Sequence, residues 1–282
     1  HVLVYNIRPL VFWGILNKFL KISSTCTITG TITYTKNGKI RYLYKQLIDL
    51  TLKEFNFVVF QNQIDSNLFK KIGSNNKQKR HIINGSGVDI EYFKNDYKSK
   101  KIWDFIFIGR VLKDKGILEY LKASKKILSK YPNTKFSIIG PFYRNSKNNS
   151  HLTLNDIKKY LNKNVIYLGE SNDIKKHLSN SKCLVLPSYG EGFSNVLLEA
   201  GSMELPLITT NVPGCREIVI NKFNGLLCKP RNVLHLTKKI ELFINLSNKE
   251  KLFLGKNSRK HIVKNFSKKH IVNKYLSLLN LK

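Results

Sequence analysis

Short apolar runs that stop at glycine or proline recur along this chain, with helical patterns between them. Phe136–Gly140 and Val165–Gly169 each end in glycine, and Lys182–Pro187 ends in proline. Such bounded runs are typical of buried parallel strands. The intervals Asp156–Leu161 and Asp173–Leu178 have helical patterns. Strands that alternate with helices predict an α/β fold with a parallel sheet.

The segment after the proline-terminated run is rich in glycine and leads into a helix. Ser188–Phe193 contains too much glycine to extend the strand, and Ser194 is a candidate N-cap for the apolar stretch Val196–Met203. The first backbone amides of a helix lack internal partners and bind anions well. We therefore expect unpaired amide donors over Gly192–Ser194.

Two acidic residues flank this helix start. Glu191 lies on the loop between two glycines, which allow a ligand to approach the backbone closely. Glu199 shares one helical stripe with Asn195 and Ser202. A structural alternative stays open for both, since Glu191 fits an ordinary loop acid and Glu199 fits a solvated polar stripe.

A second strand, turn and helix pattern lies upstream. The apolar run Lys101–Ile108 ends at Gly109, and a basic turn then leads into a helical pattern from Ile117. Arg110 and Lys115 lie in this turn, where a guanidinium and an ammonium suit a diphosphate. Ligands of open α/β sheets bind at the carboxyl ends of strands. The alternative is that both are ordinary members of a set of 49 basic residues.

Together these segments resemble the family-four, or group 1, retaining glycosyltransferases. The resemblance rests on the Gly109–Gly116 turn, on Glu191 and Glu199 with seven residues between them, and on the trailing segments Pro206–Glu217 and Asn224–Leu227. It extends from Asn84 to the C-terminus and is closest to transferases of capsule, O-antigen (lipopolysaccharide) and lipid-linked oligosaccharide synthesis. It implies the GT-B fold, which has two facing Rossmann-like domains with parallel sheets.

The resemblance also implies a reaction and a site. A sugar would be transferred from a nucleoside diphosphate donor to a hydroxyl of a glycan or polyprenyl-diphosphate-linked acceptor, with retention of configuration at the anomeric carbon. The resemblance implies no metal or cofactor. The expected donor consists of UDP and an N-acetylated hexose. Arg110 and Lys115 would hold the diphosphate, Glu191 would contact the donor sugar, and Glu199 would bind the ribose hydroxyls. The remaining expected donor-site residues are Gly109, Gly140, Gly169, Gly192, Phe193, Ser194 and Asn195.

The resemblance implies three regions. Residues 1–95 form a partial N-terminal acceptor-side domain, 96–265 a nucleotide-sugar-binding domain, and 266–282 a helix that returns to the first domain. Thr29–Ile32 stands where the family has a Thr-Gly-Leu-Gly turn. Because a Rossmann-like domain needs on the order of 150 residues, we expect this domain to be incomplete, its natural N-terminus lying outside this sequence.

Composition limits the environment of the chain. With 282 residues, 42% of them hydrophobic, it can bury the cores of two α/β domains. Its four cysteines lack the close spacing of metal ligands, which favours a reducing cytosol and no structural metal. No apolar run is long enough to span a bilayer. The expected location is the cytoplasm, in solution or on the inner face of the plasma membrane.

The net charge of +31 has three interpretations. Basic segments such as Lys77–Arg80 and Lys98–Lys101 suit an anionic membrane surface or, less well, nucleic acid, for which no recognition motif is present. Alternatively, lysine is simply the usual surface residue, as the asparagines of Asn145–Asn149 also indicate. A predicted helix carries the apolar residues Phe12, Trp13, Leu16, Phe19 and Leu20 together with Lys18 and Lys21. This helix either contacts a membrane or packs its apolar side on the sheet, and we slightly favour packing on the sheet.

Two other functions remain open on this sequence. A sugar-nucleotide epimerase shares the GT-B fold, although it lacks this spacing of glutamates. A non-catalytic fragment that keeps the nucleotide-sugar pocket would carry the same motifs. Fold alone does not separate these possibilities, so the residues of the site must.

Overall fold

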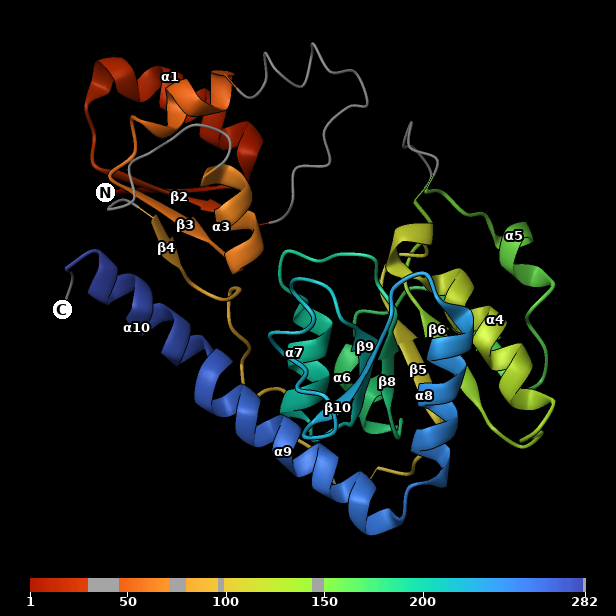
Figure 1. Cartoon of the computed structure of the whole chain (residues 1–282). Coiled ribbons are helices and arrows are strands. Elements are labelled where there is room, and N and C mark those ends of the chain that lie inside the picture. The colour runs from red at the N-terminus through yellow and green to blue at the C-terminus, as the bar shows by residue number, and fades with distance from the viewer. Residues whose placement is uncertain (30–45, 71–79, 96–98, 144–149, 281–282) are drawn as a thin grey trace. The chain divides into compact units, whose positions relative to one another are not determined.

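A computed structural model of the protein describes residues 1–29, 46–70, 80–95, 99–143 and 150–280 (Figure 1). The chain divides into two compact units. The first comprises His1–Gly85, Glu191–Phe193 and Asn273–Lys282, and the second comprises Ser86–Gly190 and Ser194–Val272. The expectations for residues 30–32, 77–79, 98 and 145–149 lie outside the described residues. The three predicted regions 1–95, 96–265 and 266–282 stay predictions.

The first unit is built on a parallel sheet of four strands in the order β1-β2-β3-β4. The apolar core between this sheet and its helices includes the fully buried Leu10, Ile28, Ile48, Phe55 and Phe60. The strands are β1 (Val2–Tyr5), β2 (Ser24–Ile28), β3 (Phe57–Phe60) and β4 (Arg80–Ile82), and the helices are α1 (Ile7–Leu20), residues 46–52 and α3 (Gln63–Lys70).

Helix α1 carries apolar side chains on its outer side as well as on its inner side. Its inner side consists of Leu10, Gly14 and Asn17, which are buried, while Trp13 packs against the core from its margin. The expectation that the apolar side chains of this helix pack on the sheet is wrong for the outer side, where Phe12 and Phe19 are 68% and 79% exposed. Glycine at position 14 explains the choice of inner face, since a Cβ atom there would lie 2.5 Å from the Cβ of Thr51. Leu16 and Leu20 are also exposed.

The second unit contains a parallel sheet of six strands in the order β10-β9-β8-β5-β6-β7. The chain enters at the centre of the sheet, proceeds outward to β7, and then returns to the other side of β5. This order places a topological switch point between β5 and β8. The strands are β5 (Phe105–Ile108), β6 (Phe136–Ile139), β7 (Val165–Tyr167), β8 (Leu184–Leu186), β9 (Leu207–Thr210) and β10 (Gly225–Cys228).

Helices cover both faces of this sheet (Figure 1). Helix α4 (Ile117–Leu128) packs against α8 (Val233–Asn245), and α7 (Asn195–Ser202) packs against α9 (Asn248–Phe266). The shorter helices are α5 (Leu154–Lys158) and α6 (Ile174–Ser179), and α10 (Lys268–Leu278) follows α9. The four predicted strands and the alternation of strands with helices are therefore confirmed.

One helix boundary differs from its prediction. The helix expected over Asp156–Leu161 begins at Leu154 and ends at Lys158. The backbone N–H and the hydroxyl of Thr153 both donate to the Asp156 carboxylate, at 2.7 and 2.8 Å. This reciprocal capping starts the helix before Asp156, whose side chain closes its first turn.

Candidate functional site

The two segments that the sequence marks separately meet at the switch point of the second unit. The turn Gly109–Gly116 follows β5, and the loop that begins at Pro187 follows β8. The backbone N–H of Tyr189 donates to the carbonyl of Asp114 at 2.8 Å. At Gly116 a Cβ atom would lie 2.0 Å from the carbonyl oxygen of Pro187. The turn and the loop are thus packed backbone to backbone, which explains why position 116 is glycine.

The two predicted diphosphate cations belong to this turn. Arg110 is exposed, with its guanidinium carbon 5.9 Å from the centre of the Tyr143 ring. Lys115 is half-buried and closes the short 3₁₀ turn Lys113–Lys115. Both cations therefore follow the carboxyl end of β5, the edge at which open α/β sheets bind anionic ligands.

The predicted glycines of the neighbouring strands lie at the same edge. The backbone N–H of Gly140 donates to the carbonyl of Gly169 at 2.9 Å, and the Tyr167 hydroxyl donates to the Gly140 carbonyl at 2.9 Å. A Cβ atom at Gly140 would lie 2.0 Å from the carbonyl oxygen of Gly109. The ends of β5, β6 and β7 are therefore drawn together by close backbone contacts.

Helix α7 begins as predicted, but its amides differ from the expectation. Ser194 is the N-cap residue, although its side chain makes no capping hydrogen bond. Its backbone N–H donates to the carbonyl of Gly214 at 3.1 Å, so the expectation of an unpaired amide is wrong at this position. Asn195 is exposed, and its side-chain oxygen accepts a hydrogen bond from Ser86 at 3.5 Å.

Glu199 does not lie on a solvated stripe. Its neighbour on the stripe, Ser202, is buried and donates to the carbonyl of Phe93 at 2.7 Å. Glu199 itself is half-buried, and within the described part of the chain its carboxylate has no hydrogen bond or ion pair. Burial raises the pKa of this carboxyl. A half-buried carboxylate without a protein partner can accept hydrogen bonds from ligand hydroxyls.

The loop Glu191–Phe193 groups with the first unit. Within that unit, the side-chain amide of Asn62 donates to the carbonyl of Gly192 at 3.2 Å. A Cβ atom at Gly192 would lie 1.8 Å from the carbonyl oxygen of Thr29, so only glycine fits. Glu191 is half-buried and Phe193 is buried.

The side chains that contact Tyr189, in the β8–α7 loop, cannot be predicted from sequence patterns. The Tyr189 hydroxyl donates to Glu119 at 2.7 Å, and the guanidinium carbon of Arg231 lies 4.7 Å from the centre of the Tyr189 ring. No local motif links these residues, because Glu119 lies 70 positions from Tyr189 in the chain. Only the sheet order brings them together.

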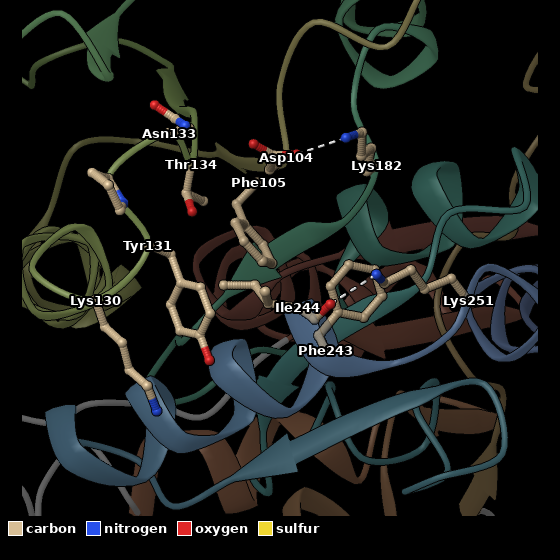
Figure 2. Close-up of a pocket in the computed structure, with 11 residues that line it drawn as sticks. Asp104, Phe105, Lys130, Tyr131, Asn133, Thr134, Lys182, Phe243, Ile244 and Lys251 are labelled. Atoms are coloured by element: carbon tan, nitrogen blue, oxygen red, sulfur yellow. Dashed lines mark hydrogen bonds and ion pairs between the residues drawn. The ribbon is translucent and has the colours of Figure 1, made fainter.

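A cavity of about 450 Å³ lies at the opposite, amino-terminal edge of the second sheet (Figure 2). Its three lysines are already engaged: Lys130 pairs with Glu241, Lys182 with Asp104 at 2.8 Å, and Lys251 donates to the Ile244 carbonyl at 2.9 Å. None of the predicted site residues lines it. The charges of this cavity are therefore satisfied by the protein, unlike the carboxylate of Glu199.

Two further observations concern metals and membranes. Among the described residues, no three or more His, Cys, Asp or Glu side chains form a group able to hold a metal ion. The four cysteines are all buried and are not joined in disulfides. Of the helices that the structure describes, none has the length and apolarity required to cross a membrane.

Comparison with known proteins identifies the family. The family described as glycosyl transferases group 1 matches residues 89–261. The chain belongs to this family. The predictions of the family and of the α/β fold with parallel sheets are confirmed.

Two relatives of this group 1 chain are named for capsular polysaccharide synthesis and for transfer to a diphospho-undecaprenol-linked sugar. It is 31% identical to the capsular polysaccharide biosynthesis glycosyltransferase CapM of Staphylococcus aureus, over 77% of this chain and 60% of CapM. It is 26% identical to the Campylobacter jejuni N,N'-diacetylbacillosaminyl-diphospho-undecaprenol alpha-1,3-N-acetylgalactosaminyltransferase, over 86% of this chain and 65% of that enzyme. The chain thus spans less than two thirds of the length of these relatives.

A solved structure supports the fold. Anabaena HepE, crystallised in complex with UDP, matches 99% of this chain and 79% of its own with a TM-score of 0.83 at 16% sequence identity. At this identity the likeness concerns the fold, which is GT-B. The roles of individual site residues stay predictions.

Proposed function

We propose that this group 1 glycosyltransferase moves a sugar, with retention, from a UDP-linked donor to a hydroxyl of a glycan or polyprenyl-diphosphate-linked acceptor. The observation that carries the proposal is the meeting of the basic Gly109–Gly116 turn with the β8–α7 loop at the switch point. The names of the relatives support a lipid-linked acceptor in surface polysaccharide synthesis, and the UDP complex of HepE supports the nucleotide.

In the proposed reaction, Arg110 and Lys115 stabilise the negative charge that grows on the leaving diphosphate. Charged groups held in place before the reaction often lower the barrier more than any other single effect in an enzyme. We propose that these two cations perform this task without a metal ion or another cofactor. Glu191 orients the donor sugar, and Glu199 accepts hydrogen bonds from the ribose hydroxyls. The other donor-site glycines let the backbone approach the nucleotide.

Binding measurements test this proposal directly. Calorimetric titration of the chain with UDP, GDP, ADP, UMP and a panel of UDP-sugars identifies the nucleotide. Arg110→Ala should weaken UDP by about 10-fold or more and UMP much less, because a charged hydrogen bond to the distal phosphate is lost. Lys182→Ala, an exposed lysine at the opposite edge of the sheet, is the matched control.

The same titrations separate the alternatives. Equal losses for UDP and UMP would place Arg110 away from the distal phosphate. Failure of a folded chain to bind any nucleotide would overturn the proposed donor site. Transfer of the sugar to an acceptor, as opposed to its epimerisation or to binding without turnover, distinguishes the glycosyltransferase from the two alternative functions.

We also propose an anionic membrane surface, and not nucleic acid, as a partner, with the protein on the cytoplasmic face of the plasma membrane. The outer side of α1 exposes Phe12, Ile15, Leu16 and Phe19, which recur at helical spacing. Exposed apolar stripes mark interaction surfaces, and the net charge of +31 favours anionic lipids. A lipid-linked acceptor would be found at the same surface.

Vesicle sedimentation tests this partner. The chain should bind vesicles that contain phosphatidylglycerol more strongly than vesicles of phosphatidylcholine alone. Phe12→Ser and Phe19→Ser should each weaken binding by roughly 10-fold, because each ring loses apolar burial in the lipid. The control is Phe253→Ser on α9, where the ring is 56% exposed. Equal effects of all three substitutions would refute a specific role of α1.

A further inference from the structure

We propose that Tyr189, held by Glu119, is a positioning residue that fixes the start of the β8–α7 loop, from which the chain continues to Glu191. The inference deepens the proposed function, on which its catalytic part rests. Tyr189 comes immediately after the buried Ser188 and two residues before Glu191. Tyr189 contacts three other segments of the second unit.

Tyr189 is anchored through its backbone, its hydroxyl and its ring. The backbone N–H donates to the Asp114 carbonyl at 2.8 Å, which ties the loop to the basic turn. The hydroxyl donates to Oε1 of Glu119 on α4 at 2.7 Å. The Arg231 guanidinium, from the segment between β10 and α8, lies over the ring at 4.7 Å. Three separate parts of the second unit therefore converge on one residue, two of them on its side chain.

Within the described structure, the Glu119 carboxylate has no hydrogen-bond partner other than the Tyr189 hydroxyl. Oε2 of Glu119 is buried and has no hydrogen-bond partner there. The bond from Tyr189 is thus the single hydrogen bond that stabilises this carboxylate, and hydrogen bonds to charged groups are the strong ones. Burial and this bond both raise the pKa of Tyr189, so the phenol remains a donor. A carboxylate placed in this way is costly unless the tyrosine stays in place.

The role of these contacts follows from the position of Tyr189, two residues before Glu191 in the chain. The next residue, Gly190, is exposed, and a Cβ atom there would meet no atom within 4 Å. The Gly190 carbonyl accepts a hydrogen bond from Oγ of Ser188 at 3.2 Å, and the Gly190 N–H donates to the same atom at 3.5 Å, so Ser188 and Tyr189 together anchor the end of the second unit before Glu191. If the Tyr189 hydroxyl bond is lost, the segment that leads to Glu191 loses one of its anchors, while the backbone hydrogen bonds of the turn that carries Arg110 and Lys115 remain.

Tyr189→Phe removes the hydroxyl and keeps the ring. It should accelerate hydrogen exchange of the backbone amides of residues 189–195 and weaken binding of UDP-sugars by about 10-fold, whereas UDP alone changes by less than about 3-fold. Glu119→Ala should have the same effect. Glu119→Gln should restore most of the affinity, because its side-chain oxygen still accepts the bond from Tyr189.

The protein contains a matched control for these variants. The Tyr131 hydroxyl donates to Glu241 at 3.4 Å, and Lys130 lies 5.5 Å from the centre of the Tyr131 ring. This tyrosine, glutamate and cation repeat the chemistry of the Tyr189 cluster at the opposite edge of the same sheet (Figure 2). Tyr131→Phe should leave both the exchange of residues 189–195 and the affinity for UDP-sugars unchanged.

The outcomes separate the two proposals. If the parent chain binds neither UDP nor any UDP-sugar of the panel, the proposed function fails, and amide exchange still decides whether Tyr189 anchors the loop. Unchanged exchange in Tyr189→Phe overturns the positioning role. Equal losses for UDP and UDP-sugars, or equal effects of Tyr131→Phe, would also overturn it, since they indicate a general loss of stability.

Discussion

Replacing Gly116 with alanine should destabilise the second unit through one steric contact. Gly116 has a φ of +74° at the junction of the 3₁₀ turn and α4, and its N–H donates to the Lys113 carbonyl at 3.0 Å. An alanine pays about 1–2 kcal/mol for this left-handed conformation. Its Cβ would also lie 2.0 Å from the carbonyl oxygen of Pro187, so the turn and the loop must separate. Overpacking of this kind costs about 1–3 kcal/mol more.

Gly169→Ala isolates the steric part of this cost. Gly169 has a similar φ of +82°, but a Cβ atom there would meet no atom within 4 Å. The two variants share the conformational penalty and differ in the clash. The free energy of unfolding should therefore be about 2 kcal/mol lower for the Gly116 variant than for the Gly169 variant. For a unit of this size, this difference corresponds to a melting temperature that is roughly 4–8 °C lower.

Tryptophan fluorescence makes the measurement specific to one unit. The chain has two tryptophans, Trp13 in the first unit and Trp103 in the second. In a Trp13→Phe background, Trp103 alone reports thermal unfolding of the second unit. Equal melting temperatures for Gly116→Ala and Gly169→Ala would refute the reasoning, because they would show that the Pro187 carbonyl moves aside without cost.

Three further outcomes are expected. Glu199→Ala should weaken UDP binding with little change in the circular dichroism of the chain, and an unchanged affinity would remove Glu199 from the site. Burial raises the pKa of Glu199, so the charged carboxylate destabilises the folded chain at a pH above this raised pKa. At a pH below the pKa of an unfolded glutamate, about 4.3, the carboxyl is neutral in both states and this effect is absent. Glu199→Gln should therefore unfold at a higher temperature than the parent at pH 7, and the gain should shrink as the pH approaches 4. The four buried cysteines should resist a thiol reagent in the native protein and all react in denaturant, and rapid reaction of a native thiol would contradict their burial.

Local patterns sufficed to predict the elements that position the site. Apolar runs ended by glycine or proline marked β5, β6, β7 and β8, because a buried parallel strand must be apolar on both faces and must stop at the sheet edge. Ser194 was predictable as the N-cap of α7 for the same local reason. The family motifs also lie within these short segments, so they too are visible without a structure.

Such local patterns could not predict the contacts between segments that are distant in the sequence. The pairing of the Ser194 amide with Gly214, and the exposure of Phe12 and Phe19 on a helix that is apolar all round, depend on which neighbours the sheet order supplies. Periodicity shows that a face is apolar, but it does not show whether another element covers that face.

The sequence by itself therefore determined the family, the α/β class and the segments that carry Arg110, Lys115, Glu191 and Glu199. The tertiary structure decided that the turn after β5 and the loop after β8 meet, that Glu199 is half-buried, and that Tyr189 is held by Glu119. The physical reason is the range of the interactions. Strand and helix patterns arise between residues a few positions apart, whereas packing at the switch point joins residues that lie 70 or more positions apart.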